Sequence, residues 1–99
     1  MTEFEWDAQK EISNIQKRGI DFTTASRIWD GRVFERIDAR HHYGEVRYQA
    51  FDIAANRILT VVFTWRAETR RLISARRASA YEKKLFETEI AKPDSSPSN

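Results

Sequence analysis

The spacing of apolar residues changes at Arg32, and this change limits the folds open to the chain. Before Arg32, apolar residues recur at helical spacing; after it, they alternate in short runs that are separated by turn residues. The run Ile58–Trp65 is apolar on both faces, which is typical of a strand at the centre of a sheet. Helices grouped ahead of consecutive strands indicate an α+β domain.

Four strands fit the region after Arg32. Between the second and third of them, Ala54–Arg57 is a natural hairpin turn that contains Asn56. In the second strand, Arg47 and Gln49 fall on the opposite face from the apolar residues. The predicted strands are Val33–Asp38, Val46–Ile53, Ile58–Trp65 and Arg71–Arg77, with a short edge strand at Glu3–Trp6.

Two helices are predicted ahead of the sheet. The first begins after the N-cap residue Asp7 and runs to about Arg18, where Gly19 ends it. The second covers Asp21–Trp29, with Asp21 as its cap. At helical spacing, three apolar residues of the first helix share one face: Ala8, Ile12 and Ile15. The predicted buried stripe of the second helix is Phe22, Ala25, Ile28 and Trp29.

A third helix is predicted after the last strand, because Ser79 and Glu82 have the spacing of a capping box. It should carry three side chains onto the core, Tyr81, Leu85 and Phe86. Residues 1–92 then form one domain, and the polar segment Pro93–Asn99 is predicted to be a disordered tail. The expected fold is an α+β domain whose antiparallel sheet is packed by two N-terminal helices and one C-terminal helix.

Composition narrows the class of protein. The 99 residues support one core, and a hydrophobic content of 40% favours a folded chain although 32% of the residues are charged. The chain has no cysteine, which excludes disulfides and thiolate zinc sites. Because the first residues lack a signal-peptide pattern and no run of about 18 apolar residues occurs, we expect a cytoplasmic protein that does not contact a membrane.

The net charge of +2 hides an uneven distribution. Residues 31–77 hold ten basic residues, all of them arginine, against five acidic ones, a net charge of +5. The flanking residues 1–30 and 78–99 carry −2 and −1. Because the planar guanidinium group binds phosphate through paired hydrogen bonds, the predicted sheet favours an anionic partner.

No known pattern for a metal or a nucleotide-hydrolysing site is present. Three isolated glycines cannot form a phosphate-binding loop, and neither HExxH nor CxxC occurs. We therefore predict no metal and no cofactor. Arg47 and Arg76 each lie inside a predicted strand, and they could hold one phosphate between them if they share the polar face. The competing interpretation is that such arginines are only solvated or shield a sheet edge.

RNA cleavage needs little machinery, because the 2′-hydroxyl is an internal nucleophile. The reaction needs a proton acceptor, a proton donor and fixed cations, and arginine can supply only the cations. The candidates for proton transfer are Lys17, His42, Tyr43 and Glu45. Each is open to a second interpretation: Glu45 could form a salt bridge, Tyr43 could lie at the core edge, and His41 and His42 could be solvated loop residues.

Four segments, Phe4–Asp7, Lys17–Phe22, Tyr43–Arg47 and Leu72–Ser79, have the order and spacing of motifs in one family. Over residues 3 to about 87 the chain resembles the BrnT family of bacterial toxins. The resemblance implies a RelE-like fold and a ribonuclease toxin that blocks translation. It also implies a BrnA antitoxin whose ribbon-helix-helix dimer binds operator DNA, so that the two proteins together repress their own promoter.

By position, the basic residues of the family fall on Lys17, Arg47 and Arg76. The resemblance thus implies that Arg47 and Arg76 stabilise the developing charge and that Lys17 holds RNA, while Glu45 or His42 moves protons. Four further arginines are predicted to contact RNA: Arg18, Arg40, Arg71 and Arg77.

The chain departs from the family at two positions. Many members have a histidine in place of Arg18, and many related sequences have an aspartate in place of His42. Arginine cannot transfer a proton under ordinary conditions, so His42 becomes the candidate to replace the missing histidine. Two alternatives stay open: a non-catalytic module that binds nucleic acid or an acidic antitoxin, and a toxin that lost its activity with its histidine.

Overall fold

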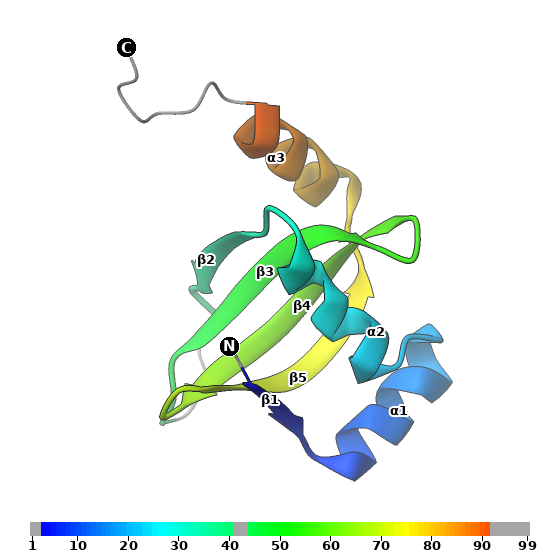
Figure 1. Cartoon of the computed structure of the whole chain (residues 1–99), viewed down its shortest axis with the longest axis vertical. Helices are drawn as coiled ribbons and strands as arrows, with labels where there is room; N and C mark the ends of the chain where they lie inside the picture. Colours follow the sequence, from blue (N-terminus) through cyan, green and yellow to red (C-terminus); the bar gives the residue numbers. More distant parts are fainter. Residues whose placement is uncertain (1–2, 41–43, 92–99) are drawn as a thin grey trace.

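The computed structural model describes residues 3–40 and 44–91, which form a five-stranded sheet with three α-helices and one short 3₁₀ helix (Figure 1). The strands are β1 (Glu3–Trp6), β2 (Phe34–Asp38), β3 (Arg47–Ala54), β4 (Arg57–Arg66) and β5 (Thr69–Arg77). The helices are α1 (Ala8–Arg18), α2 (Phe22–Ser26), η1 (Arg27–Asp30) and α3 (Ala80–Ala91). The predicted α+β class is confirmed. The predicted tail lies outside the described residues.

The sheet is mixed, so the prediction of a wholly antiparallel sheet was wrong. Its strands lie in the order β1-β5-β4-β3-β2, and β2 to β5 form an antiparallel meander around the predicted central strand β4. β1 joins β5 in parallel, with Glu5 opposite Arg71. The direction in which β1 joins the sheet depends on the long connection through α1 and α2, and no local pattern encodes it.

The predicted hairpin turn between β3 and β4 is confirmed. Ala55 and Asn56 close it with positive φ angles of 53° and 62°. Two successive positive φ angles match the type I′ turn, whose twist suits a two-residue hairpin and which asparagine tolerates well. β4 and β5 are joined by a second tight turn, in which Ala67 has a φ angle of 55°.

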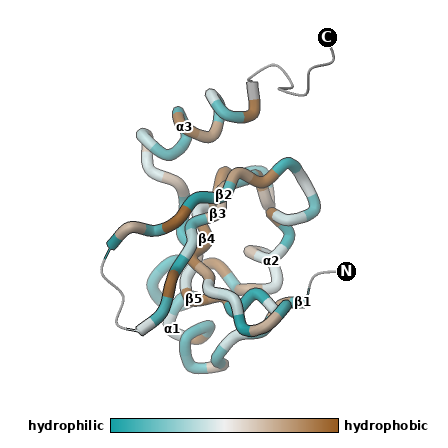
Figure 2. The backbone as a smooth tube through the Cα atoms, turned by 90° about the vertical axis from the view of Figure 1, so that its left-hand side faces the viewer, coloured by the Kyte–Doolittle hydropathy of each residue, from teal (hydrophilic) through white to brown (hydrophobic). Residues whose placement is uncertain are grey.

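One face of the sheet carries the hydrophobic core. The β4 side chains of Leu59, Val61 and Phe63 are fully buried there. The predicted stripe of the second helix packs on them, with Phe22, Ala25 and Ile28 fully buried and Trp29 partly buried. The predicted helix is divided, because α2 ends at Ser26 and η1 continues the chain. Seen from the side, α2 lies on one side of the strands and α3 lies beyond their upper end (Figure 2).

α1 covers the edge of β5 that β1 leaves free. β1 pairs with β5 only at residues 69–72. Further along, Asn14 Oδ1 accepts a hydrogen bond from the Ala75 backbone N–H at 3.0 Å, and Asn14 Nδ2 donates to the Ile20 carbonyl at 2.8 Å. The apolar stripe of α1 faces solvent instead, since Ile12 is 47% and Ile15 is 44% exposed. A polar residue faces inward because an open strand edge presents backbone groups that need partners.

The predicted capping box begins α3. The Glu82 backbone N–H donates to Ser79 Oγ at 3.1 Å, and the Ser79 backbone N–H donates to the Glu82 carboxylate at 2.9 Å. Phe86 is buried and Leu85 is half-buried, as predicted. The prediction for Tyr81 was wrong, because this side chain is 67% exposed. Glu82 and Phe86 are four residues apart and share the inner face, and Tyr81 is turned about 100° away from Glu82.

Candidate functional site

The face of the sheet opposite the core carries arginines from three strands, and we call it the polar face. Neighbouring residues in register project to the same side of a sheet, while successive residues of one strand alternate. Arg36 is in register with Gln49, Arg47 with Asp38, Arg71 with Thr64 and Arg76 with Thr60. The predicted RNA contact Arg77 projects to the other side, because it is in register with the core residue Leu59.

Arg76 is held on the polar face by a buried carboxylate. Its Nη1 and Nη2 donate to the two oxygens of Glu82 at 2.6 and 2.8 Å. Thr60 Oγ1 donates to the same carboxylate at 3.0 Å, and the Glu82 side chain is only 8% exposed. The pair uses the outer end of the guanidinium, so the edge that carries Nε–H is left for an anion such as a phosphate.

This environment determines the charge state of Glu82. Burial alone would raise the pKa of its carboxyl group, but hydrogen bonds from Arg76, the Ser79 backbone and Thr60 outweigh burial and lower this pKa to about 2. The hydrogen bond to Glu82 in turn raises the pKa of Arg76. Both groups are therefore charged near neutral pH, and Glu82 is a poor proton carrier there.

A second ion pair lies beside the first. Asp38 is almost fully buried at the end of β2, and Arg40 Nε donates to its Oδ1 at 2.9 Å. This hydrogen bond raises the pKa of Arg40. The charges of Arg40 and Asp38 act on Arg76, although Asp38 is in register with Arg47. We call the Arg76–Glu82 pair the α3 corner.

Lys17 and Arg18 lie on the same side of β5 as Arg76. Both come from the last turn of α1, and they line a pocket of about 260 Å³ between α1 and β5 that also includes Ser74. Ser74 and Arg76 are alternate residues of β5 and project from the same face. The structure therefore brings the predicted residues Lys17 and Arg18 toward the α3 corner, because their contact on β5, Ser74, is two residues before Arg76.

Arg47 shares the polar face with Arg76 but lies at the far end of it. Arg76 is in register with Thr60. Arg47 directly precedes Tyr48, which is in register with Phe63, so Arg47 lies at the level of Thr64. Their levels on β4 thus differ by about four residues, roughly 13 Å at 3.3 Å per residue. Arg47 Nε instead donates to Glu45 Oε2 at 2.7 Å. The two arginines do not form a single phosphate clamp.

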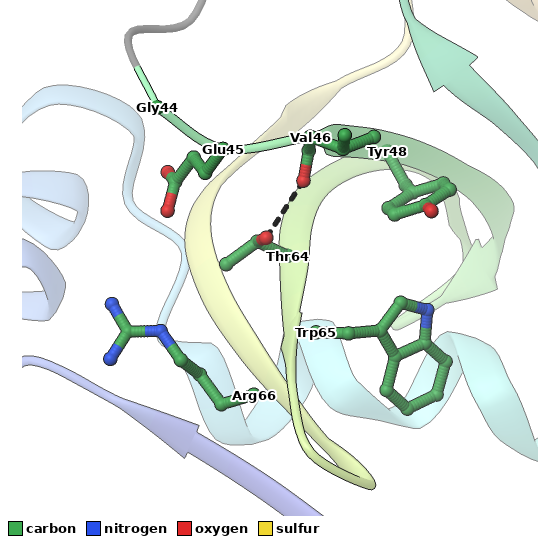
Figure 3. Close-up of a pocket in the computed structure, with 7 residues that line it drawn as sticks. All are labelled: Gly44, Glu45, Val46, Tyr48, Thr64, Trp65 and Arg66. Atoms are coloured by element: carbon green, nitrogen blue, oxygen red, sulfur yellow. Dashed lines mark hydrogen bonds between the residues drawn. The ribbon is translucent and has the colours of Figure 1, made fainter.

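Glu45 lines an open pocket of about 450 Å³ where the ends of β3 and β4 separate. Figure 3 shows Glu45 and Arg66 on one side of this pocket and Tyr48 and Trp65 on the other. Between them, the Thr64 hydroxyl donates to the Val46 carbonyl at 2.7 Å. We call it the β3–β4 pocket; its lining is Gly44, Glu45, Val46, Tyr48, Thr64, Trp65 and Arg66.

The cations beside the β3–β4 pocket are held loosely. Arg71 is in register with Thr64 and bonds Glu5 at 2.7 Å, with both side chains partly exposed. Arg66 has no carboxylate partner within residues 3–40 and 44–91. The pocket thus joins a carboxylate, exposed guanidinium groups and two aromatic rings.

Comparison with known proteins shows the family of the chain. The family described as "Ribonuclease toxin, BrnT, of type II toxin-antitoxin system" matches residues 6–82, which is most of the chain. The chain belongs to the BrnT family. A crystal structure of the Brucella abortus ribonuclease toxin BrnT superimposes with a TM-score of 0.59 and 25% identity, over 80% of this chain and 99% of that one. No significant match was found among curated protein sequences.

Membership of the BrnT family places the chain among the ribonuclease toxins of type II toxin-antitoxin systems, and these systems pair a toxin with an antitoxin. In the described parts of this BrnT-family chain, no helix is both long and apolar enough to cross a membrane. Likewise, no three histidine, cysteine, aspartate or glutamate residues within the described ranges are grouped as metal ligands.

Sequence reasoning missed part of this site. Glu82 was recognised as a helix cap, and nothing in its local pattern showed that it also holds Arg76. Trp65 was predicted as a covered strand residue, although it is 39% exposed and lines the pocket. Arg66, which follows the predicted strand Ile58–Trp65, was not among the predicted site residues. The predicted proton-transfer candidates His42 and Tyr43, with His41, lie outside the described residues.

Proposed function

We propose that this chain is an endoribonuclease toxin that cuts RNA without a metal ion, and that the reaction takes place in the β3–β4 pocket. In this proposal Glu45 is the proton acceptor, and Arg47 and Arg66 are the cations. One observation carries it: Glu45 Oε2 lies 2.7 Å from Arg47 Nε at an open pocket. A base and a fixed cation at one place are what cleavage by the 2′-hydroxyl requires.

The proposed reaction needs no cofactor. Glu45 takes the proton of the 2′-hydroxyl, and the 2′-oxygen attacks the adjacent phosphorus atom. The bond from phosphorus to the 5′-oxygen of the next nucleotide breaks, and protonation of that oxygen yields a 5′-hydroxyl and a 2′,3′-cyclic phosphate. Arg47 stays protonated and stabilises the added negative charge. His42 stays the candidate to protonate the leaving oxygen.

In the same proposal the α3 corner binds the RNA backbone away from the cut. Arg76 offers a guanidinium edge at a fixed position, and Lys17, Arg18 and Arg40 add positive charge on the same side of β5 and β4. Arg71 links this end to the pocket. Arg76 therefore binds and orients RNA, so its substitution should mainly change the affinity for RNA.

The cellular part of the proposal follows from the family. We propose a BrnA-like antitoxin of the ribbon-helix-helix type, a toxin–antitoxin complex that binds operator DNA and represses its promoter, and a RelE-like toxin that inhibits translation in the cytoplasm. The arginines of the polar face support an acidic antitoxin segment as the inhibitor, because it would compete for the surface that binds RNA. Growth arrest on induction, relieved by the neighbouring antitoxin gene, tests this part.

The activity is tested with end-labelled single-stranded RNA and the purified chain. Glu45→Gln removes the base without changing shape, so cleavage should fall by roughly 100- to 10,000-fold. Glu87→Gln, an exposed carboxylate on α3, is the matched control and should cut like the parent. Products should end in a 2′,3′-cyclic phosphate, and EDTA should leave the rate unchanged. A Glu45→Gln protein that cuts at the parental rate would exclude the assignment.

The same assay separates cleavage from binding alone. A non-catalytic module should bind RNA with strong salt dependence, because neutralised phosphates release counterions, and should leave the RNA intact after long incubation. Arg76→Lys keeps a positive charge opposite Glu82 but loses the guanidinium edge. It should weaken RNA binding by about tenfold, since a charge-assisted bidentate contact contributes roughly 1–3 kcal/mol, and the cleavage rate at saturating RNA should change little.

A further inference from the structure

Trp65 is unusual among the residues of the central strand. The preceding core-side residues of β4, Leu59, Val61 and Phe63, are fully buried, whereas Trp65 on the same side is 39% exposed. It lies at the end of β4, where the strand passes the β3–β4 pocket, and Tyr48 from β3 lines the same pocket. Figure 3 shows the two rings on the side of the pocket opposite Glu45 and Arg66. A large exposed aromatic beside a polar pocket is typical of a binding site.

The indole ring of Trp65 is held in a fixed orientation. The Arg70 guanidinium carbon lies 4.5 Å from the ring centroid, over one face, and Phe63 meets the ring edge-on with a centroid distance of 5.8 Å. Arg70 is itself fixed by a hydrogen bond to Glu35 at 2.9 Å. Because Arg70 covers one face of the indole, a ligand can stack only on the other face. Such a ring can stack on a ligand without first being ordered.

The surroundings of the two rings suit a nucleotide rather than an apolar ligand. The pocket volume of about 450 Å³ is within the usual range for small-molecule sites. Its polar side presents Arg66, and Arg47 and Arg71 lie close by on the polar face, so a phosphate would meet positive charge. A base on the aromatic side would then have its sugar and phosphate directed toward Glu45 and Arg66.

We propose that one nucleobase of single-stranded RNA stacks on Trp65, with Tyr48 beside it, and that this nucleotide supplies the 2′-hydroxyl to Glu45. The inference rests on the proposed function for the last step only, because the stacking itself requires no cleavage. Stacking on an aromatic ring accepts every base, so the site holds the nucleotide in place and gives at most a weak base preference.

The test measures binding of short 2′-O-methyl RNA, which lacks the internal nucleophile and cannot be cut by the proposed reaction. Trp65→Leu should weaken binding by roughly 5- to 100-fold, the range expected for one stacked base. Trp65→Phe keeps a stacking face and should stay within about threefold of the parent. Tyr81→Leu, an exposed aromatic on α3, is the matched control and should bind as the parent does.

A second measurement varies the RNA. In a series of oligonucleotides that each lack one base, the parent chain should bind one member less tightly than the others. Trp65→Leu should bind all members equally. If Trp65→Leu and every abasic oligonucleotide bind like their parents, the inference is wrong. It is equally wrong if Trp65→Leu weakens only antitoxin binding. RNA cleavage without any effect at Trp65 contradicts the stacking site alone, whereas stacking without cleavage contradicts the proposed function alone.

Discussion

The two ends of the polar face hold their arginines in different ways. At the α3 corner, Arg76 and Glu82 pair in a bidentate arrangement, and their side chains are 29% and 8% exposed. At the β3–β4 pocket, Arg47 Nε bonds Glu45, and their side chains are 30% and 27% exposed. The two arginines are thus equally exposed, and the pairs differ in their carboxylates: Glu82 is buried and fixed, whereas the more exposed Glu45 can exchange partners with a ligand. We therefore assign the larger contribution to stability to the α3 corner and the proposed chemistry to the β3–β4 pocket.

The largest effect on stability is expected at the α3 corner. Glu82→Gln should lower the free energy of unfolding by about 3 kcal/mol, because it removes a buried carboxylate that accepts hydrogen bonds from Arg76, Thr60 and the Ser79 backbone. In a domain of this size such a loss lowers the melting temperature by roughly 15 °C. Thermal and urea unfolding measure it, with the exposed Glu87→Gln as the control. A loss below about 0.5 kcal/mol would show that the α3 corner behaves like a surface pair.

The lowered pKa of Glu82 predicts that the free energy of unfolding depends on pH. The pKa of Glu82 is lowered from its ordinary value of 4.5 to about 2 in the fold. A lowered folded-state pKa means that the unfolded chain binds the proton first, so the contribution is complete above about pH 4.5 and is lost as the pH falls toward 2.

The parent chain should therefore lose stability between pH 5 and 2 more steeply than Glu82→Gln, by an amount on the order of 2 kcal/mol. Urea unfolding of both proteins at a series of pH values measures the difference. Comparing the two proteins is necessary because the pKa values of Asp7 and Asp21 are also lowered by hydrogen bonds at helix N-termini, and their contributions cancel in the difference. Parallel curves for the two proteins would contradict the assignment.

Local sequence patterns predicted the helices and strands at both ends of the polar face, but not the side-chain contacts between them. The capping box marked Glu82 because a serine and a glutamate three residues apart satisfy each other within one turn. Its bond to Arg76, six residues earlier, depends on the path of the chain between β5 and α3. Its bond to Thr60, 22 residues earlier, depends on how α3 packs against the sheet. Composition and periodicity carry no information about either contact.

Periodicity also leaves open which side of an element faces the core. The apolar stripe of α1 is present, yet Asn14 faces the sheet because the free edge of β5 needs hydrogen-bond partners. The pattern of β4 predicted a covered strand along its whole length, but Trp65 is partly exposed because it lies next to the end of β4, beside the open β3–β4 pocket. Both exceptions depend on where neighbouring elements end. One of them, Trp65, lies in the candidate site.

The smallest effect on stability is expected where the largest effect on catalysis is proposed. Glu45→Gln should change the free energy of unfolding by less than about 0.5 kcal/mol, because solvent largely replaces a partly exposed ion pair. Urea unfolding beside the cleavage assay tests both properties of one protein. If Glu45→Gln loses as much stability as Glu82→Gln, the two ion pairs do not differ in their contribution to stability. A loss of cleavage would then reflect unfolding. A stable variant that no longer cuts would assign the loss to the carboxylate itself.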